Sequence, residues 1–245
     1  MKKKRLGFHV AFIATTSRFR VSRFIVIEGL IGVGKTTLCR LVQERWGASL
    51  VLEPVEDNPF LTQFYSDRAR FAFPTQMFYL ASRHAQQLAL QQRELFSDLV
   101  VSDYLYAKDR LFAQETLAGD EMELYDRFAG LLKDQIPSPE FVLFLDCPTD
   151  VLLKRIERRA IQSEQVIEPK YLESLRTRYF ELWDGFTDAP VYVLDTTKRN
   201  YADDPAAQEW ILSLIQGWLS GTPHPDAPAA WGTNPDQLAL FGFAP

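Results

Sequence analysis

A glycine-rich segment that ends in a lysine and a threonine has the spacing that points most directly to chemistry. Residues 29–36 read GLIGVGKT and fit the pattern G-x-x-x-x-G-K-[ST]. The β-branched run of residues 25–27 before them predicts a buried strand, and residues 37–46 after them have helical spacing. In that order, the amide groups of the loop and the start of the helix bind phosphate oxygens. The sequence therefore predicts a site for a nucleoside triphosphate rather than a glycine turn that binds nothing.

Side chains and main chain have separate roles in this loop. Glycine lets the backbone fold closely around an anion, because a Cβ would block the approach and the positive φ. We expect Lys35 to neutralise the β- and γ-phosphates of ATP and the Thr36 hydroxyl to bind Mg²⁺. The expected ATP-binding residues are Gly29, Gly32, Val33, Gly34, Lys35, Thr36 and Thr37, together with Arg155 and Arg159 from a later helix.

Acidic residues follow two other predicted strands. The apolar run of residues 49–52 ends at Glu53, and that of residues 98–102 ends at Asp103. Because ligands of open α/β sheets bind outside the carboxyl ends of the strands, the two acids should converge beside the glycine loop. Glu53 is then placed to take a proton from a hydroxyl group that faces the γ-phosphate, although taken alone it could equally be a solvated strand end.

Two further groups of residues have both a structural and a functional interpretation. Residues 55–83 are rich in aromatic side chains, which usually indicates a core, but Gln76 and Arg83 lie on one helical face and would suit a pocket for a flat ring. A later helix carries four cations, Lys154, Arg155, Arg158 and Arg159. Such a cluster is normally a solvated face, but arginines on a mobile segment can close over phosphates as a lid, and we favour that interpretation.

One α/β domain must position these residues. We expect a five-stranded parallel sheet with helices on both faces and the arginine-bearing lid over its carboxyl rim. The predicted strands are residues 25–28, 49–52, 98–102, 141–145 and 191–194. The predicted helices after the glycine loop include residues 84–96, 107–117, 121–134, 171–183 and 206–219.

Composition narrows the class of protein. The chain has 245 residues, of which 47% are hydrophobic and 24% charged, values that are ordinary for a soluble globular protein. The net charge of −5 argues against a protein that coats nucleic acid, and no apolar run is long enough to span a membrane. The two cysteines, Cys39 and Cys147, are expected to be buried thiols. The need for ATP favours a cytoplasmic location.

The chain divides into three parts. Residues 1–22 form a basic extension that we expect to be disordered, although its beginning also imitates a signal peptide. Residues 23–219 form the globular domain, and residues 220–245 form a flexible tail rich in proline and alanine. The tail contains QLALF at residues 237–241, which could dock on the body, on a partner subunit or on another protein. This peptide resembles the Q-L-x-L-F motif by which many bacterial proteins bind the replication sliding clamp.

In order along the chain, these segments resemble the deoxyribonucleoside kinase family, specifically its bacterial deoxyadenosine and deoxyguanosine kinase branch. The resemblance rests on GLIGVGKTT at 29–37, the strand end 53–55, the blocks 58–61 and 64–65, the helix between 76 and 83, the triplet 102–104 and the lid 155–164. It implies a P-loop kinase fold and transfer of the γ-phosphoryl group of ATP to the 5′-hydroxyl of a deoxyribonucleoside in nucleotide salvage. It also implies a homodimer built from helices of the regions 77–95 and 107–133.

The resemblance assigns roles to individual residues. The catalytic residues would be Lys35, Glu53, Asp103 and Arg159, with Glu53 as the general base and Mg²⁺ beside Thr36 and Asp103. The nucleoside-binding residues would be Glu53, Tyr65, Gln76, Arg83, Asp109 and Glu164. Among these, the pair of Tyr65 and Glu164 would bind the sugar 3′-hydroxyl, and the amide of Gln76 would pair with the edge of the base.

Three positions depart from the family pattern. Tyr104 stands where the motif that begins at Asp103 usually has arginine, so one phosphate contact must come from elsewhere or be missing. Residues 160–161 are Ala-Ile where the lid often has Gly-Arg. Lys108 competes with Asp109 for the position of the base-pocket aspartate. The base preference is therefore open, with a leaning to purines.

Two other functions are compatible with the glycine loop. A thymidylate-kinase-like nucleoside monophosphate kinase would need cations for the phosphate of its acceptor and no general base at Glu53. An ATP-binding module would use residues 237–241 to hold a partner such as the clamp, without turnover of any nucleoside.

Overall fold

The computed structural model describes residues 23–53, 57–93, 97–132 and 137–233 of the chain. Its centre is a five-stranded sheet whose strands all run parallel, in the order β2-β3-β1-β4-β5. The strands are β1 (Arg23–Gly29), β2 (Ser49–Val51), β3 (Leu99–Ser102), β4 (Phe141–Asp146) and β5 (Val191–Asp195). Each lies within about two residues of its predicted position, so the predicted parallel sheet is confirmed.

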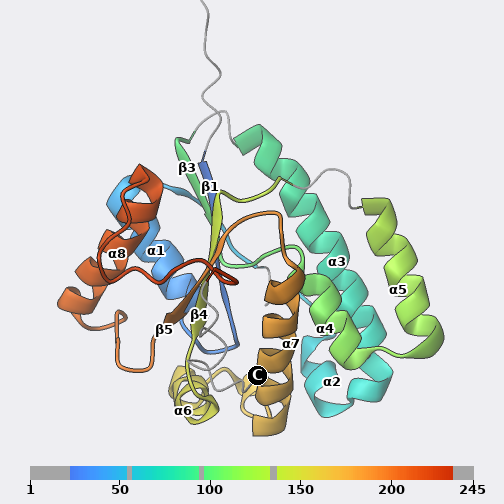
Figure 1. Cartoon of the computed structure of the whole chain (residues 1–245). Helices are drawn as coiled ribbons and strands as arrows, with labels where there is room; N and C mark the ends of the chain where they lie inside the picture. Colours follow the sequence, from blue (N-terminus) through green and yellow to red (C-terminus); the bar gives the residue numbers. More distant parts are fainter. Residues whose placement is uncertain (1–22, 54–56, 94–96, 133–136, 234–245) are drawn as a thin grey trace, which may run out of the picture.

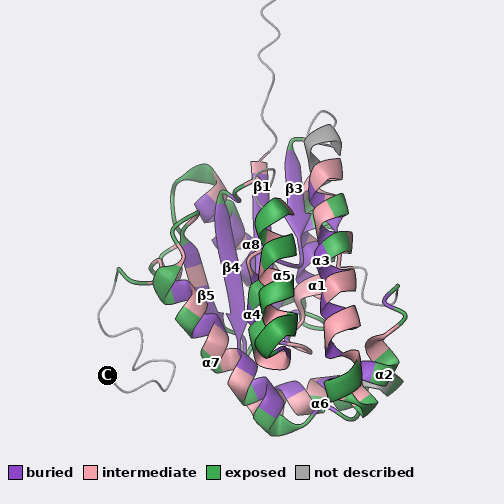
Figure 2. Cartoon of the chain, turned by 90° about the vertical axis from the view of Figure 1, so that its right-hand side faces the viewer, coloured by how far each residue is buried: buried purple, intermediate pink, exposed green. Residues whose placement is uncertain are grey.

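The central strands are apolar along almost their whole length because helices cover both faces of the sheet. β1 is buried from Phe24 onward, and every residue of β3 and β4 is buried as well. Figure 2 shows these strands in purple behind the helices. A parallel sheet covered on both faces requires such continuous burial, whereas a strand with one wet face would alternate. A charged side chain, that of Glu28, lies within the buried run of β1.

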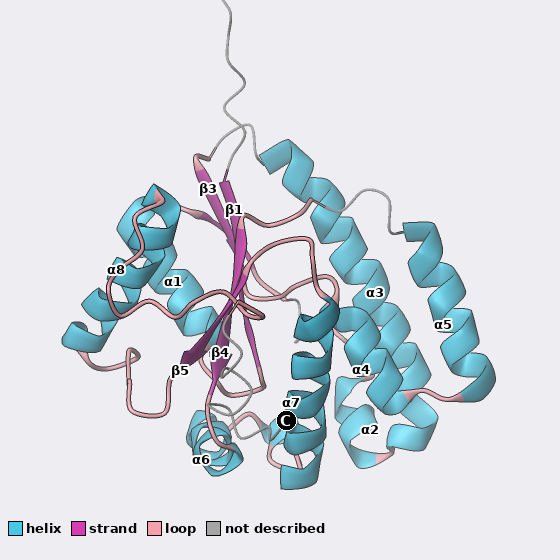
Figure 3. Ribbon diagram, viewed as in Figure 1, coloured by secondary structure: helices cyan, strands magenta, loops and turns pink. Residues whose placement is uncertain are grey.

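Helices form a thin layer on one face of the sheet and a thicker layer on the other (Figures 1 and 3). The first layer consists of α1 (Lys35–Trp46) and α8 (Pro205–Ser220). The second consists of α4 (Lys108–Thr116) and α7 (Pro169–Gly185), with α3 (Arg68–Arg93) and α5 (Gly119–Leu132) packed outside. Near the carboxyl ends of the strands lie α2 (Leu61–Ser66), α6 (Thr149–Arg159) and a short 3₁₀ turn (Gln162–Glu164).

The helix α3 is longer toward its amino end than the sequence indicated. A helix that carries Gln76 and Arg83 and continues through residues 84–96 was expected, and α3 begins at Arg68, ahead of Pro74. Proline has no N–H group, so one main-chain hydrogen bond of the helix is lost there. Packing against α2 and α4 keeps the helix continuous through this position. The continuous helix presents Gln76 and Arg83 on the side that faces the carboxyl rim of the sheet.

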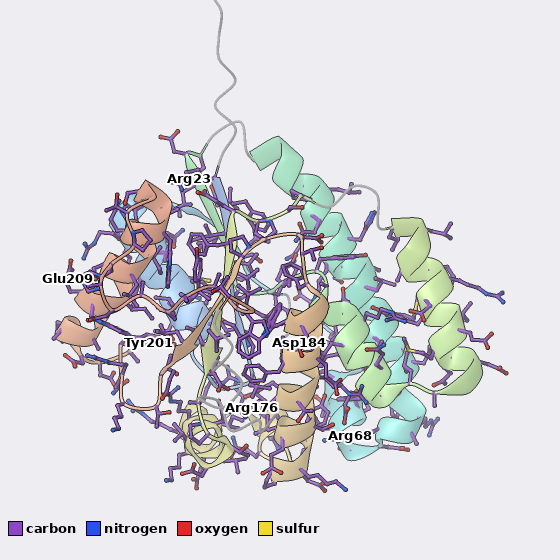
Figure 4. The ribbon with its side chains drawn as sticks, viewed as in Figure 1. Arg23, Arg68, Arg176, Asp184, Tyr201 and Glu209 are labelled. Atoms are coloured by element: carbon purple, nitrogen blue, oxygen red, sulfur yellow. The ribbon has the colours of Figure 1, made fainter. Side chains whose placement is uncertain are left out.

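Part of the segment expected to be a flexible tail packs on the body. Ala230 forms an antiparallel bridge with Tyr192 of β5, and the amide of Trp231 donates to the carbonyl of Val191 at 2.7 Å. The indole N–H of Trp231 donates to Asp184 of α7 at 2.9 Å, and Figure 4 shows Asp184 beside this segment. The sequence missed this contact because its composition, rich in proline and alanine, gives no periodic signal. The extension 1–22 and the peptide 237–241 lie outside the described residues.

Two simpler expectations concern the cysteines and the membrane. Cys39 and Cys147 are both buried and unpaired, so the expectation of reduced thiols is confirmed. Among the described residues, the longest apolar helical segments fall short of what a membrane crossing needs.

Candidate active site

The glycine loop connects β1 to α1 in a conformation that side chains would prevent. Gly29 has φ 148° and Gly34 has φ 107°, values in the left-handed half of the φ range that glycine tolerates. A Cβ at Gly29 would lie 2.4 Å from the carbonyl oxygen of Leu145, and one at Gly34 would lie 2.5 Å from the hydroxyl of Tyr201. Both glycines are therefore required by backbone angle and by space. The loop has the shape of an anion cradle that the sequence predicted.

Lys35 lies across this loop. Its Nζ atom donates to the carbonyl oxygens of Gly29 at 2.7 Å and Leu30 at 3.1 Å. Burial, and then the charge of Lys108, lower the pKa of Lys35 to about 8. A phosphate group in the loop would replace these neutral carbonyl contacts with ionic ones and favour the protonated amine.

The two strand-end acids meet beside the loop, as their positions in the sequence predicted. The Thr36 hydroxyl donates to Oδ2 of Asp103 at 2.6 Å, and the amide of Glu53 donates to Oδ1 of Asp103 at 2.7 Å. Thr36 and Asp103 are thus a hydroxyl and a carboxylate in contact, a set that suits Mg²⁺, which keeps most of its ligands as phosphate oxygens and water. Within the described residues, no three His, Cys, Asp or Glu side chains form a metal-binding group by themselves. Thr36 and Asp103 are therefore suited to a metal ion that enters the site already bound to ATP.

The carboxylate of Glu53 is held between two cations. Lys108 donates from Nζ to Oε2 of Glu53 at 2.9 Å, and Arg83 pairs with Oε1. Arg83 forms a second ion pair with Asp109. The side chain of Glu53 keeps 13% of its surface exposed, toward the cavity described next. The predicted base therefore faces the glycine loop and is not a solvated strand end.

A cavity of about 980 Å³ opens between the glycine loop and α3. The predicted residues that line it are Gly29, Gly32, Lys35, Thr36, Thr37, Glu53, Tyr65, Gln76, Arg83, Asp103, Arg159 and Glu164. Asp109 is not among the lining residues, because its carboxylate is buried behind Arg83. Lys108 lines the cavity in its place, which is the alternative that the sequence left open.

The wall formed by α3 offers polar groups to a ligand. Gln76 donates from Nε2 to the hydroxyl of Thr116 at 3.2 Å, while its Oε1 atom is buried without a hydrogen-bond partner in the described part of the chain. The hydroxyl of Thr75, one residue earlier on the cavity wall, is in the same state. Leaving a buried polar atom unpaired costs free energy, so a ligand that pairs with these atoms is favoured. Sequence reasoning found Gln76 and missed Thr75.

Tyr65 and Glu164 lie at another part of the same cavity. Burial raises the pKa of Tyr65 well above its ordinary value, and Tyr171, Tyr79 and Glu164 add to the effect. Its hydroxyl therefore stays protonated and can donate a hydrogen bond. Glu164 is buried and forms an ion pair with Arg159 of α6. Tyr65 and Glu164, the predicted sugar-binding pair, are far apart in the sequence but line one cavity with Arg159.

Arg155 differs from the lid arginine that was expected. It donates from Nη1 to the carbonyl of Val33 at 3.0 Å and from Nη2 to the carbonyl of Thr196 at 3.0 Å. Tyr201 also donates to the carbonyl of Val33, at 3.1 Å, and Figure 4 shows its ring between β5 and α1. Arg155 therefore stabilises the conformation of the glycine loop through the carbonyl of Val33. It also lines a second cavity of about 330 Å³, together with the glycine loop and residues 199–202.

A carboxylate that the sequence analysis did not single out supports this arrangement. Glu28 is fully buried in β1 and accepts hydrogen bonds from the amides of Gly29 at 2.9 Å and Leu105 at 2.7 Å. Its third donor is the hydroxyl of Tyr179, at 3.1 Å. A glutamate inside an apolar strand, directly before the glycine loop, was the signal that could have revealed it.

Comparisons with known proteins agree with this geometry. Residues 25–220 match the sequence profile of the deoxynucleoside kinase family. A deoxyguanosine kinase of Bacillus subtilis is 38% identical over 198 residues, which cover 79% of this chain and 96% of that protein. A deoxyadenosine kinase of Lactobacillus acidophilus is 27% identical over 203 residues, covering 78% of this chain and 94% of that protein.

A solved structure supports the fold in the same way. Deoxyadenosine kinase from M. mycoides with bound dATP superposes with a TM-score of 0.67, at 24% identity, over 79% of this chain and 99% of that one. This likeness confirms the P-loop kinase fold. Neither the thymidylate-kinase-like enzyme nor the ATP-binding module is favoured by these matches. Because the family profile spans most of the sequence, the chain belongs to the deoxynucleoside kinase family and is an ATP-dependent phosphotransferase.

Proposed function

We propose that this deoxynucleoside kinase acts on purine deoxynucleosides, deoxyguanosine foremost, with Glu53 as the general base and Mg²⁺ beside Thr36 and Asp103. The observation that carries the proposal is the carboxylate of Asp103, which joins the hydroxyl of Thr36 at 2.6 Å to the amide of Glu53 at 2.7 Å. The phosphate side and the acceptor side of the cleft are therefore held at one fixed separation. Positioning of this kind supplies most of the catalysis in phosphoryl transfer.

The reaction proceeds by in-line displacement. Glu53 accepts the proton of the 5′-hydroxyl as its oxygen bonds to the γ-phosphorus, and the bond from that phosphorus to the β,γ-bridging oxygen breaks to release ADP. Lys35 and Arg159 neutralise the charge that spreads over the γ-phosphoryl oxygens. Mg²⁺, when bound with ATP, supplies further neutralisation of the phosphates.

The preference for a purine rests on the wall formed by α3. Gln76 offers an unpaired acceptor, and Arg83 offers donors at the inner end of the cavity. Guanine presents donors on N1 and N2 and acceptors on O6 and N7, so it can pair with both kinds of group. The name of the B. subtilis relative, deoxyguanosine kinase at 38% identity, points the same way.

The test is an acceptor screen of the four deoxynucleosides with ATP, for the wild type and Glu53→Gln. We expect the highest kcat/KM with deoxyguanosine, and Glu53→Gln should lower kcat by about 10²–10⁴. Glu140→Gln is the matched control, because Glu140 is an exposed carboxylate that pairs with Arg23 away from the cleft. A preference for a pyrimidine would overturn the base assignment, and unchanged turnover of Glu53→Gln would remove Glu53 as the base.

We also propose a homodimer through the outer face of α5. This helix carries Leu124 and Phe128, each 42% exposed, and Leu131, 81% exposed, at helical spacing on one side. Figure 2 shows α5 at the front with a largely exposed surface. Sedimentation velocity should give a dimer for the wild type and a monomer for Phe128→Glu. Glu123→Lys on the same helix is the control, and a monomeric wild type would refute the dimer.

The remaining proposals concern the tail and the location of the protein. We propose that residues 237–241 bind a protein partner such as the sliding clamp, and that the enzyme works in the cytoplasm, where ATP is supplied. A labelled peptide of residues 234–245 should bind the clamp, and the same peptide with alanine at Leu238 and Phe241 should not. Equal binding of both peptides, or binding of neither, would exclude the clamp.

A further inference from the structure

We propose that Thr116, the last residue of α4, is a positioning residue that sets base specificity: its hydroxyl holds the Gln76 amide so that the oxygen, and not the nitrogen, faces the ligand. The proposal rests on the proposed function, in which Gln76 contacts the base. It goes beyond that function because it names the residue that decides which amide atom meets the base, and hence the kind of base edge that the site takes.

The Thr116 hydroxyl has one proton, and that proton is already in use. Its oxygen lies 2.7 Å from the carbonyl oxygen of Phe112, one helical turn earlier. Two oxygen atoms approach this closely when a hydrogen lies between them, so the hydroxyl donates to the carbonyl. Toward any other neighbour, the Thr116 oxygen can therefore only accept a hydrogen bond.

That neighbour is Gln76 on the adjacent helix α3 (Figure 1). Nε2 of Gln76 lies 3.2 Å from the Thr116 oxygen and donates to it. A half-turn about the last side-chain bond of Gln76 would exchange the two amide atoms and place the amide oxygen against an oxygen that has no proton to give. The hydrogen-bond network thus selects one of the two orientations of the amide.

The selected orientation leaves the amide oxygen for the ligand. Gln76 is 2% exposed and lines the main cavity, and its Oε1 atom has no hydrogen-bond partner among the described residues. Thr116 is not one of the residues that line this cavity, so it acts on a ligand through Gln76. A base with an N–H group at this edge satisfies Oε1, whereas a base with only lone pairs there leaves it unpaired.

Thr75 shows by contrast why a fixed group is needed. Its hydroxyl lies on the same cavity wall, and within the described ranges of the chain it has no hydrogen-bond partner. A hydroxyl group turns about its bond and both donates and accepts, so it adapts to either kind of base edge. Of these two groups on α3, only the amide of Gln76 can discriminate between the two kinds, and it does so because Thr116 holds it.

The end of α4 is itself held in place. The amide of Leu117 donates to the carbonyl of Ala113 at 2.7 Å, and Glu115 forms an ion pair with Arg178 of α7. Thr116 stands between these two contacts, so its oxygen keeps a fixed position against α3.

The experiment measures the ratio of kcat/KM for deoxyguanosine to kcat/KM for purine 2′-deoxyriboside, a nucleoside whose base has no N–H group. Thr116→Val should lower this ratio by about 10-fold or more, because the amide can then turn and offer Nε2 to a base that only accepts. Thr116→Ser keeps the hydroxyl and should keep the ratio within about 3-fold of the wild type. The missing 6-oxygen of the analogue affects every variant alike, so it cancels in the comparison.

Two controls separate a positioning role from a general loss of structure. Thr177→Val removes a hydroxyl that donates in the same way to a carbonyl one turn earlier, that of Glu173, on an exposed part of α7, and should leave the ratio unchanged. In the Gln76→Leu background, Thr116→Val should change the ratio by less than about 2-fold, because the group through which it acts is gone. Partial unfolding lowers both values of kcat/KM equally and does not move their ratio.

The result that would overturn the proposal is a wild-type ratio in Thr116→Val, or a fall of the ratio in the Gln76→Leu background as large as in the wild type. If Thr116→Val does not fold, Thr116→Ala, which also removes the hydroxyl, takes its place under the same criteria.

A wrong base assignment gives a different result. If the acceptor screen shows a preference for cytosine, the proposed purine preference fails, and the ratio of deoxycytidine to its analogue without the 4-amino group then decides the role of Thr116 by the same criteria. If Gln76→Leu keeps the wild-type ratio, Gln76 does not contact the base, and the role of Thr116 is overturned with it.

Discussion

The two walls of the cleft present different groups to a ligand, since one is formed mainly by the main chain and the other mainly by side chains. The phosphate wall is mostly main chain: a loop of glycines with positive φ, backed by Arg155 and Tyr201, which donate to the loop carbonyl of Val33. The opposite wall, which we propose binds the nucleoside (the nucleoside wall), is mostly side chains: Arg83 of α3 and Lys108 of α4 both pair with Glu53. A main-chain site needs few residue types at fixed spacing, whereas a side-chain site needs partners that meet only in three dimensions.

Replacing Lys35 tests the charged side chain that lies across the glycine loop of the phosphate wall. Lys35→Met should lower kcat by about 10²–10⁴, because the main chain has no charge to put in place of the ammonium. Steady-state turnover of deoxyguanosine measures the effect. Lys154→Met is the control, since Lys154 is an exposed cation of α6 that pairs with Asp150. Normal turnover of Lys35→Met would show that the loop does not hold the reacting phosphates.

Adding one methyl group tests the main-chain part of the same wall. Gly34→Ala places a Cβ 2.5 Å from the Tyr201 hydroxyl at φ 107°, so the protein should lose about 1 to 3 kcal/mol of stability and bind ATP about 10-fold or more weakly. Thermal unfolding and ATP titration measure both effects. The double variant Gly34→Ala/Tyr201→Phe should regain part of the loss, because the clashing oxygen is gone. No recovery would assign the whole effect to backbone strain.

Removing an amide tests the nucleoside wall. Gln76→Leu should lower kcat/KM for deoxyguanosine by about 10- to 100-fold while leaving the KM for ATP unchanged, because a buried polar contact to the base is lost. Thr116→Val, which removes only the hydroxyl that accepts from Gln76, should have a smaller effect. Equal losses for deoxyguanosine and deoxycytidine would show that Gln76 does not read the base.

The smallest expected effect is a proton taken up with ATP. The pKa of Lys35 is lowered from 10.5 to about 8, chiefly by burial, so the empty enzyme has lost much of this proton by pH 8.5. Triphosphate charge favours the ammonium form, so binding should take up about half a proton near pH 8 and almost none at pH 6.5. Calorimetry in buffers of different ionisation enthalpy measures it. Uptake that persists in Lys35→Met would assign the proton to another group.

The fold was largely predictable because its signals are local. Each strand is a short apolar run that ends in a turn or an acid, and the order of strand, glycine loop and helix fixed the phosphate site. Glu53 and Asp103 were predictable as neighbours because the carboxyl ends of parallel strands share one rim. The roles of these residues in catalysis and binding stay predictions.

The charged corner of the cleft was not predictable for a physical reason. Lys108 and Asp109 are adjacent, and a helical pattern cannot say which of two polar neighbours faces a cavity when both are buried. The partners of Arg83 come from the segment that follows β2 and from α4, so its two ion pairs exist only after these parts of the chain pack together. Arg155 was placed on the correct helix, but its contacts to the carbonyls of Val33 and Thr196 depend on two segments that lie 122 and 41 residues away in the chain.

The short stretch around Trp231 has a consequence for how this protein tolerates truncation. β5 is an end strand of the sheet, and its outer main-chain groups meet Ala230 and Trp231 instead of water. An uncovered strand edge is a template on which a second polypeptide can add itself. A version of the chain that stops after α8 should therefore aggregate through the exposed edge of β5, although the carboxyl rim of its sheet should stay folded. A version that keeps Trp231 should not aggregate in this way.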